Sequence, residues 1–448
     1  AIPTIVGGLL YAFSSYLIAN GTWIVNIFPA EVSYFALLLF ALEQFLSHRR
    51  WYLYPIAVGL LAMLPSAAFD VYFAAWLTLI YMAIRACQNP SFDFKTQLRQ
   101  AGQLIISGIA GLGLAAFMLL SNLDTIRNSP RGTGEVVITS LSKDPTAYTV
   151  DVNILKTVLL RLFSPNMEGS AHHNQYEGWY NYLEAPMLYC GLIVLLLLPQ
   201  VFHFITRRER KLYGGLFVAF VLIALFPPLR KALWLFMGDY YRTIALLMTI
   251  VFIYMAMRAL DFIFRGQKLH LPTLIASIGV YVLIILGLAP RDTSLITPGI
   301  PLIIVFMGLH GALLYYFSKK SNYQSFPYLF LGLISVEIIS FSVPLLGERS
   351  ICTRNDVYGK RGYNDSTTDV LADIRRREKD FYRVEKDYHS GISQHFSHND
   401  AQVQEYCGTR CYNSFNSANY VRFLKSIGEI ESDSELEARS TKGLINAP

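Results

Sequence analysis

Long apolar runs separated by short polar turns fill the first 346 residues. A helix needs about 20 apolar residues to cross the hydrocarbon core of a bilayer. The pattern predicts a polytopic α-helical membrane protein with about eleven transmembrane helices. The runs are Ile2–Ala19, Val32–Ser47, Trp51–Ser66, Val71–Ala86, Gly102–Ser121, Leu183–Ile205, Gly214–Phe226, Thr243–Leu260, Leu271–Ala289, Pro298–Phe317 and Pro327–Leu346. The stretch Trp51–Ala86 also fits a tight hairpin through Pro65 and Ser66.

The composition supports the membrane assignment. Charged residues make up 16% of the 448-residue chain, against about 25% in soluble proteins. Of the 38 Lys and Arg and 32 Asp and Glu residues, 29 follow Thr353, so the tail is polar. A soluble enzyme, a disordered chain and a disulfide scaffold are excluded. The chain opens at Ala1 in an apolar run without Met, and we expect an excerpt trimmed at both ends.

The basic residues predict the orientation of the spans. Cytoplasmic loops of membrane proteins carry an excess of Lys and Arg. If alternate loops are cytoplasmic, Ala1 is inside and the tail after Leu346 is outside. Fourteen basic residues then lie inside, against four in the short outer loops (Arg230, Lys231, Arg242 and Arg291). The fourteen are Arg49, Arg50, Arg85, Lys95, Arg99, Arg207, Arg208, Arg210, Lys211, Arg258, Arg265, Lys268, Lys319 and Lys320.

Two long segments then face the exterior. Residues 122–182 form a large external loop with two expected short strands, Gly134–Leu141 and Tyr148–Val152. Residues 347–448 form a small extracytoplasmic α+β domain that we expect to be cut short. Its expected elements are a helix Asp369–Asp380 capped by Ser366, Thr367 or Thr368, a strand-like stretch Phe381–Glu385, and a helix Ala418–Ile427 between Ser417 and Gly428.

Acidic, tyrosine and arginine side chains gather at the outer ends of the predicted spans. Tyr and Trp alone fit an ordinary aromatic belt. Arginines there run against the positive-inside bias, and a planar guanidinium binds phosphate through two donors. The acidic group is Glu31, Asp70, Glu184 and Asp239, and the others are Tyr182, Tyr241, Arg242, Arg127 and Arg131. Glu31 also borders Trp23–Pro29, which fits a re-entrant or interfacial segment.

Two acids lie inside predicted spans. Glu43 is expected to pair with Arg49 and Arg50 at the cytoplasmic end. Glu337 lies near the middle of the last span, where it is either hydrogen-bonded in the bundle or lines a cavity.

Other chemical signals are weaker. One disulfide among Cys352, Cys407 and Cys411 is expected, because all three fall on the oxidising side. The pairs His172–His173 and His395–His398 complete no metal site, and no nucleotide-binding loop is present. We therefore predict no dedicated metal site and no nucleic-acid partner.

Several stretches resemble the YfhO-like bacterial membrane proteins, which look like GT-C type glycosyltransferases. The stretches are Gly7–Ser14, Leu42-Glu43, Gly111–Leu120 with Ser129–Arg131, Tyr182–Gly191, Tyr241-Arg242, Phe381–Glu385, Asn399-Asp400, Tyr412–Phe415 and Phe423-Leu424. Their order follows the family over nearly the whole chain, and the tail is the most specific part.

The resemblance implies an enzyme of the bacterial cytoplasmic membrane that moves a sugar from a polyprenyl-phosphate carrier to a cell-envelope acceptor such as lipoteichoic acid. It places the catalytic acid N-terminal to Ala1. Arg242, Arg131 and Arg127 would then bind the carrier phosphate, and Asp70, Glu31, Glu184, Asp239, Tyr182 and Tyr241 would contact the sugar or acceptor. A divalent metal is left open. The alternatives are a lipid or glycan flippase, which would favour paired midplane charges, and a non-catalytic envelope scaffold.

Overall fold

The computed structural model describes residues 2–20, 27–89, 93–132, 138, 148–150, 152–165, 167, 186–289, 299–319, 326–347, 353–390, 399–408, 411–412, 415–431 and 440–441. These residues fall into two compact units. The first, the membrane unit, comprises residues 1–122, 145–234 and 239–348, and the second comprises residues 123–144, 235–238 and 349–448.

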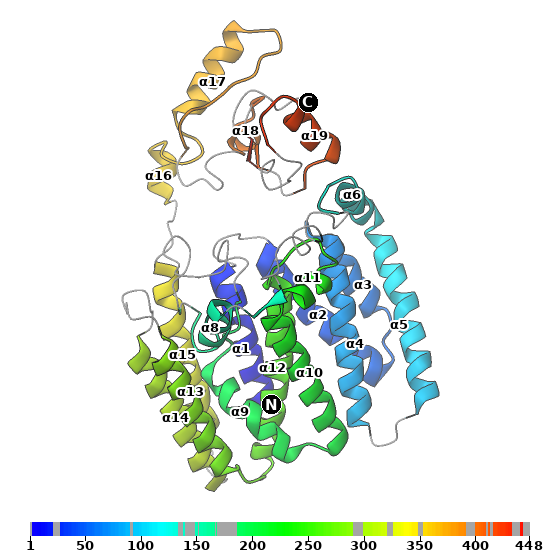
Figure 1. Ribbon diagram of the computed structural model, residues 1–448, viewed down its shortest axis with the longest axis vertical. Coiled ribbons are helices and arrows are strands. Elements are labelled where there is room, and N and C mark those ends of the chain that lie inside the picture. Colours follow the sequence, from blue (N-terminus) through cyan, green and yellow to red (C-terminus); the bar gives the residue numbers. More distant parts are fainter. Residues whose placement is uncertain are drawn as a thin grey trace. The chain divides into compact units, whose positions relative to one another are not determined.

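All regular secondary structure in the described part of the membrane unit is helical (Figure 1). Its elements are α1 (Ile2–Ala12), the π-helix η1 (Tyr16–Asn20), α2 (Ile27–His48), α3 (Leu53–Leu61), α4 (Ala67–Gln88), α5 (Phe94–Leu114), α6 (Ala116–Arg127, which continues into the second unit), α8 (Val152–Leu160), α9 (Leu192–Phe204), α10 (Arg207–Leu225), α11 (Pro227–Leu233), α12 (Arg242–Phe264), α13 (Leu271–Leu288), α14 (Ile300–Lys319) and α15 (Phe326–Gly347).

Seven helices of the described chain are long and apolar enough to span a membrane, or nine if each of two bent pairs is one span. The chain is therefore a multi-pass membrane protein, but the predicted number of about eleven is not confirmed. Three predicted spans are shorter or broken. Trp51–Ser66 holds only the nine-residue α3, Leu183–Ile205 holds the 13-residue α9, and Gly102–Ser121 bends by 86° between α5 and α6.

The fourth departure is Gly214–Phe226, which belongs to the longer helix α10. Helix α10 bends by 105° into α11. Pro227 and Pro228 explain the break, because proline lacks the N–H that would continue the hydrogen-bond ladder.

Helix α12 forms the centre of the membrane unit. It packs against α1, α4 and α9, and 83% of its apolar 18-residue stretch is buried inside the protein. Helix α13 lies at the periphery, because only 11% of its 18 residues are buried inside the protein. Close helix packing depends on small residues in membranes. At the contact of α3 with α5, for example, a Cβ atom on Gly111 would lie 2.4 Å from the carbonyl oxygen of Pro55.

The second unit carries α16 (Arg354–Tyr358), α17 (Ser366–Arg377), α18 (Asp400–Val403), β1 (Cys411–Tyr412), α19 (Ala418–Ser426) and β2 (Ser440–Thr441). Helix α19 is capped by Ser417, and Gly428 follows it with a φ of 79°. Both features were predicted. The strands β1 and β2 form one antiparallel pair of two residues each, so a genuine α+β domain is not confirmed.

Three smaller predictions in these segments need correction. Helix α17 begins three residues before the predicted start, with Asp365 as its N-cap. Phe381–Glu385 contributes only an isolated bridge from Val384 to Gly408. The expected strand Tyr148–Val152 leads instead into helix α8, whose apolar spacing the sequence interpretation missed. The other expected strand, Gly134–Leu141, lies almost entirely outside the described residues.

Candidate functional site

A polar cluster forms where four segments of the membrane unit meet at the same end. Glu31 lies in the first turns of α2, Asp70 in the first turn of α4, and Arg242 is the first residue of α12. Tyr16 opens the π-helix η1 after the break that ends α1. The alternating directions of the helices place these residues together, although they are up to 226 positions apart in the chain. We call Tyr16, Glu31, Asp70 and Arg242 the buried cluster.

Hydrogen bonds and charge hold the buried cluster together. Tyr16 donates its hydroxyl to Oε2 of Glu31, and Nη2 of Arg242 lies 3.9 Å from Oε1 of the same carboxylate. Ser66 donates to Oδ2 of Asp70 at 2.7 Å. The carboxyls of Glu31 and Asp70 lie within reach of each other's charge. One guanidinium therefore lies within reach of the charge of two carboxyls.

Burial makes this cluster unusual. Glu31 is 0% exposed and Asp70 is 1% exposed, whereas the side chain of Arg242 is 29% exposed. Oδ1 of Asp70, Nε of Arg242 and the hydroxyl of Ser15 have no hydrogen-bond partner among the described residues. Buried polar atoms are nearly always paired in proteins, so unpaired ones require an explanation such as a catalytic role or a bound ion.

Aromatic rings shield one side of the guanidinium. Arg242 lies over the ring of Phe28, 5.4 Å from its centroid, and Phe28 packs edge-on against Tyr16 at 5.5 Å. Such contacts fix the orientation of an arginine without consuming its N–H donors. Arg242 therefore keeps donors for a further anion beside Glu31.

A similar set of residues lies toward the other end of the same helices. Glu43 of α2 accepts from Tyr81 and pairs with Arg85 of α4 at 3.2 Å. The predicted pairing of Glu43 with Arg49 and Arg50 is therefore wrong. Both members of the Glu43–Arg85 pair are 38% exposed, in contrast to the buried Glu31.

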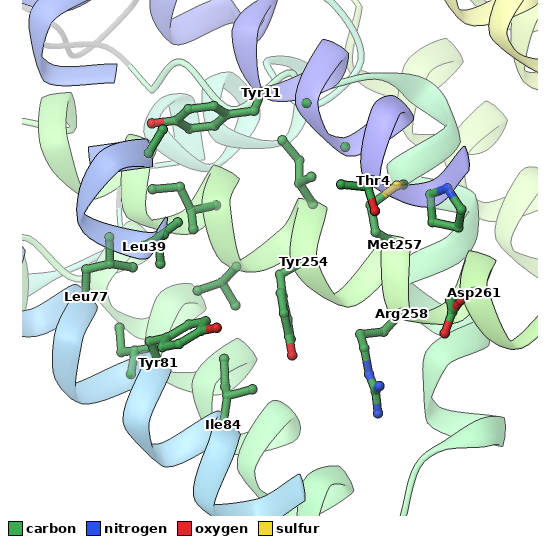
Figure 2. A pocket seen from close by; sticks show the side chains of 18 residues that line it. Thr4, Tyr11, Leu39, Leu77, Tyr81, Ile84, Tyr254, Met257, Arg258 and Asp261 are labelled. Atoms are coloured by element: carbon green, nitrogen blue, oxygen red, sulfur yellow. The ribbon is translucent and has the colours of Figure 1, made fainter. Parts of the chain in front are cut away.

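An apolar cavity of about 670 Å³ lies between α1, α2, α4 and α12, and the last three of these helices also supply the buried cluster. Figure 2 shows its lining, with Tyr11 at one end and Tyr81, Tyr254 and Arg258 toward the other. On α12 it extends from Ile250 to Asp261, which is about 16 Å along the helix axis.

Tyr11 connects the cavity with the buried cluster. Its side chain lines the cavity, its hydroxyl donates to the carbonyl oxygen of Val32 at 2.7 Å, and it lies within reach of the charge of Glu31. On α2 the cavity begins at Ala36, five residues or about 7.5 Å along the axis from Glu31. A ligand with a charged head and an apolar tail fits this arrangement.

A second arginine supports the start of α12. Arg230 is 1% exposed and pairs with Asp239, and its Nη1 donates to the hydroxyl of Tyr241 and the carbonyl of Ala224, both at 3.0 Å. Burial raises the pKa of the Tyr241 phenol, although Arg230 opposes the shift. Asp239 and Tyr241, both predicted to contact a ligand, thus serve the loop that precedes Arg242.

The structure brings together three of the predicted site residues, Glu31, Asp70 and Arg242. Arg127 and Arg131 belong to the second unit, where Nε of Arg131 donates to the carbonyl of Met237 at 2.7 Å. Their participation in one site with Arg242 stays a prediction. Tyr182 and Glu184 lie outside the described residues.

The cysteine and metal predictions have few described residues to test them. Cys407 is a free, exposed thiol, whereas Cys352 and the side chain of Cys411 lie outside the described residues. Within the described part of the chain, no three His, Cys, Asp or Glu side chains are placed to hold a metal ion.

Sequence interpretation missed Tyr16 and Ser66. Tyr16 follows Ser14 and Ser15, and this polar triplet inside an apolar run is the only signal that could have indicated a break there.

Comparison with known proteins gives one match. The family model described as "Bacterial membrane protein YfhO" matches residues 2–446, which is nearly the whole chain. No curated protein and no solved structure matches.

Proposed function

The chain belongs to the YfhO family of bacterial membrane proteins, and we propose that it is a glycosyltransferase that moves a sugar from a polyprenyl-phosphate carrier to a cell-envelope acceptor such as lipoteichoic acid. The observation that carries this proposal is a buried carboxyl pair beside an arginine, above an apolar cavity on the same helices. These are the groups needed for an acid–base reaction on a lipid-linked phosphate ester.

The buried cluster supplies the two chemical functions of the reaction. An acceptor hydroxyl attacks the anomeric carbon, and the bond from that carbon to the phosphate oxygen breaks. The resemblance put the catalytic acid N-terminal to Ala1, and we propose instead that a carboxylate of the Glu31 and Asp70 pair takes the hydroxyl proton as general base. Arg242 stabilises the negative charge that develops on the departing phosphate, an effect that is large in a site shielded from water.

The apolar cavity accepts the isoprenoid chain of the carrier. Its volume of about 670 Å³ lies within the range of small-molecule sites. Lipid tails are already in apolar surroundings, so entry into the cavity gains no hydrophobic free energy. The cavity contributes by fixing the chain, and with it the position of the phosphate beside Arg242.

The orientation follows from the basic residues. The buried cluster lies at the helix ends opposite Arg85 and Arg258. The positive-inside rule assigns those arginines to the cytoplasm. We therefore propose that the protein resides in the bacterial cytoplasmic membrane, that the reaction occurs at its outer face, and that the tail is extracytoplasmic.

A flippase for the same carrier is the second candidate. The observation that favours it is the polar lining at both ends of the cavity, from Tyr11 to Arg258 and Asp261, because a transported head group would need partners on each side. A flippase moves the lipid-linked sugar without breaking its bond to phosphate, so product analysis separates the two.

The test compares two matched pairs of variants in the full chain, reconstituted in nanodiscs with a radiolabelled polyprenyl-phosphate sugar and an envelope acceptor. Glu31→Gln and Arg242→Ala change the buried cluster. Glu43→Gln and Arg85→Ala change the same residue types in the exposed pair at the other end of the helices. We expect sugar transfer to fall about 100-fold or more in the first pair, the scale of losing one charge-stabilising donor, and to stay near wild type in the second.

Equal transfer in all four variants would refute the assignment of the buried cluster. Carrier that crosses the bilayer of sealed vesicles with its sugar still attached, and no transfer in any protein, would favour the flippase.

A further inference from the structure

A second buried polar group lies inside the membrane unit, and the reaction proposed above does not use it. Glu337 of α15 is completely buried. Its Oε1 accepts from the hydroxyl of Tyr189 and from the backbone N–H of Leu192, each at 2.7 Å, and its Oε2 lies 2.5 Å from Nε2 of His310 on α14. Of the two sequence interpretations of Glu337, the hydrogen-bonded one therefore describes the structure.

These contacts fix the start of helix α9. Leu192 is its first residue, so the Glu337 carboxyl caps one of the backbone N–H groups at the N-terminus of α9. Gly191 before it has a φ of 102°, and a Cβ atom there would lie 2.5 Å from Cδ2 of Leu10 on α1. The ring of Tyr189 stacks on Phe341, one turn after Glu337 on α15, at 5.2 Å. Helices α9 and α15 are therefore joined at one point beside α1.

The same point contacts the break between α1 and η1. The carbonyl oxygen of Tyr189 accepts from the backbone N–H of Ser15 at 2.8 Å. Ser15 directly precedes Tyr16, whose hydroxyl donates to Glu31. A break frees backbone groups that must find other partners in a membrane. Tyr189 supplies one such partner, so its position determines where Tyr16 lies.

We propose that Glu337, His310 and Tyr189 are positioning residues that act through Ser15 and Tyr16 to align the Glu31 carboxyl. The proposal rests on the function assigned to the buried cluster. Their effect is on geometry, because none of the three contacts Glu31. Small displacements of a general base are expensive, and a shift of 1 Å can lower a rate about 100-fold.

The choice of variant separates positioning from proton chemistry. Glu337→Gln keeps the size of the side chain and an oxygen that accepts from Tyr189 and Leu192, and its amide can donate to the other tautomer of His310. Glu337→Leu removes all of these bonds. A positioning role predicts that Gln is tolerated and Leu is not, whereas a proton carrier would fail with both.

Tyr189→Phe provides a milder change with a matched control. It removes one buried hydroxyl that bonds to Glu337. Tyr281→Phe removes a comparable hydroxyl, which donates to the carbonyl of Leu195 on α9 at 3.0 Å and has no described link to Tyr16. A merely structural role would make the two variants alike.

The experiment places 3-fluorotyrosine at position 16 of the full chain in nanodiscs and records its fluorine resonance, without any sugar substrate. We expect the resonance to shift or broaden in Glu337→Leu and Tyr189→Phe, and to stay unchanged in Glu337→Gln and Tyr281→Phe. In transfer assays the first two variants should lose kcat by about 10- to 100-fold with the KM for the carrier changed by less than about twofold.

An unchanged fluorine resonance in folded Tyr189→Phe would overturn the proposal, and so would equal shifts in Tyr189→Phe and Tyr281→Phe. If Glu337→Leu does not fold, the tyrosine pair still decides. Because the resonance needs no turnover, a shift without any sugar transfer by the wild type would refute the proposed function alone.

Discussion

Filling the apolar cavity from one side should weaken carrier binding without destabilising the protein. Gly8 of α1 lines the cavity, and a Cβ atom added there would meet nothing within 4 Å. Gly8→Leu therefore inserts a side chain into open space. A buried leucine makes 40–60 contacts worth about 0.1–0.2 kcal/mol each, so a carrier segment displaced by it loses about 4–12 kcal/mol of gross contact energy.

Most of that loss is recovered among the lipid tails. Protein interiors have a packing density of about 0.75 against about 0.55 for liquids, so roughly a quarter of the contact energy is net. A net loss of about 1–3 kcal/mol raises the carrier KM by about 5- to 150-fold. The rate constant kcat should change little, because the buried cluster is not touched.

The assay measures sugar transfer against carrier concentration in nanodiscs for Gly8→Leu and for Gly279→Leu. Gly279 lies in the peripheral helix α13, and a Cβ atom there also meets nothing within 4 Å. The control thus makes the same substitution in a spanning helix away from the cavity. Equal KM values in the two variants would refute the placement of the isoprenoid chain, and a lower kcat in Gly8→Leu alone would indicate that the cavity acts on chemistry instead.

Two further predictions concern stability. Gly111→Ala should destabilise the membrane unit by about 1–3 kcal/mol, the cost of overpacking, because its Cβ would lie 2.4 Å from the Pro55 carbonyl oxygen. Gly113→Ala should not destabilise it, because a Cβ there has open space around it. Denaturant titration in detergent measures the stability of both variants. Burial raises the pKa of Asp365, but hydrogen bonds from Thr367 and Ser390 outweigh it, so the pKa lies below its usual value. Its contribution to α17 is therefore present above about pH 4 and is lost as the pH falls. Hydrogen exchange of α17 amides in the full chain should show this loss, and Asp365→Ala should abolish it; a loss that persists in the variant would assign it to another group.

The sequence predicted the membrane character, the α19 helix and the grouping of three site residues at one end of their helices, and all three rest on simple signals in the chain. Hydropathy and cap residues are local signals. Because successive spans cross the membrane in alternate directions, counting the spans predicts on which side each loop lies. Glu31, Asp70 and Arg242 each lie at the same end of a helix, so this alternation alone groups them. The alternation of the spans does not predict which helices are in contact, so the contacts among these residues had to come from the structure.

The wrong predictions concern features of the structure that depend on contacts between segments far apart in the sequence. Glu43 was assigned to Arg49 and Arg50, which are near in sequence, but its partner Arg85 is 42 residues away on a neighbouring helix. The bend between α5 and α6 lies inside a continuous apolar run, so hydropathy could not reveal it. Tyr16 was missed because its role depends on the break after α1, where Ser15 donates to Tyr189, 174 positions further along the chain.

Two sets of residues, one around Glu31 and one around Glu43, each hold a Tyr, a Glu and an Arg. They have the same composition, but Glu31 is buried and Glu43 is exposed. The effective dielectric constant is far lower in the interior than near water, so a given charge acts more strongly beside Glu31 than beside Glu43. The exposed pair of Glu43 and Arg85 is screened and is worth little. In the buried cluster the carboxyls of Glu31 and Asp70 are completely enclosed, and Arg242 beside them is 29% exposed, so a phosphate can reach it from outside the enclosure. The chemistry is therefore expected at the end that holds Glu31, because the end that holds Glu43 lacks the enclosure that gives those charges their effect.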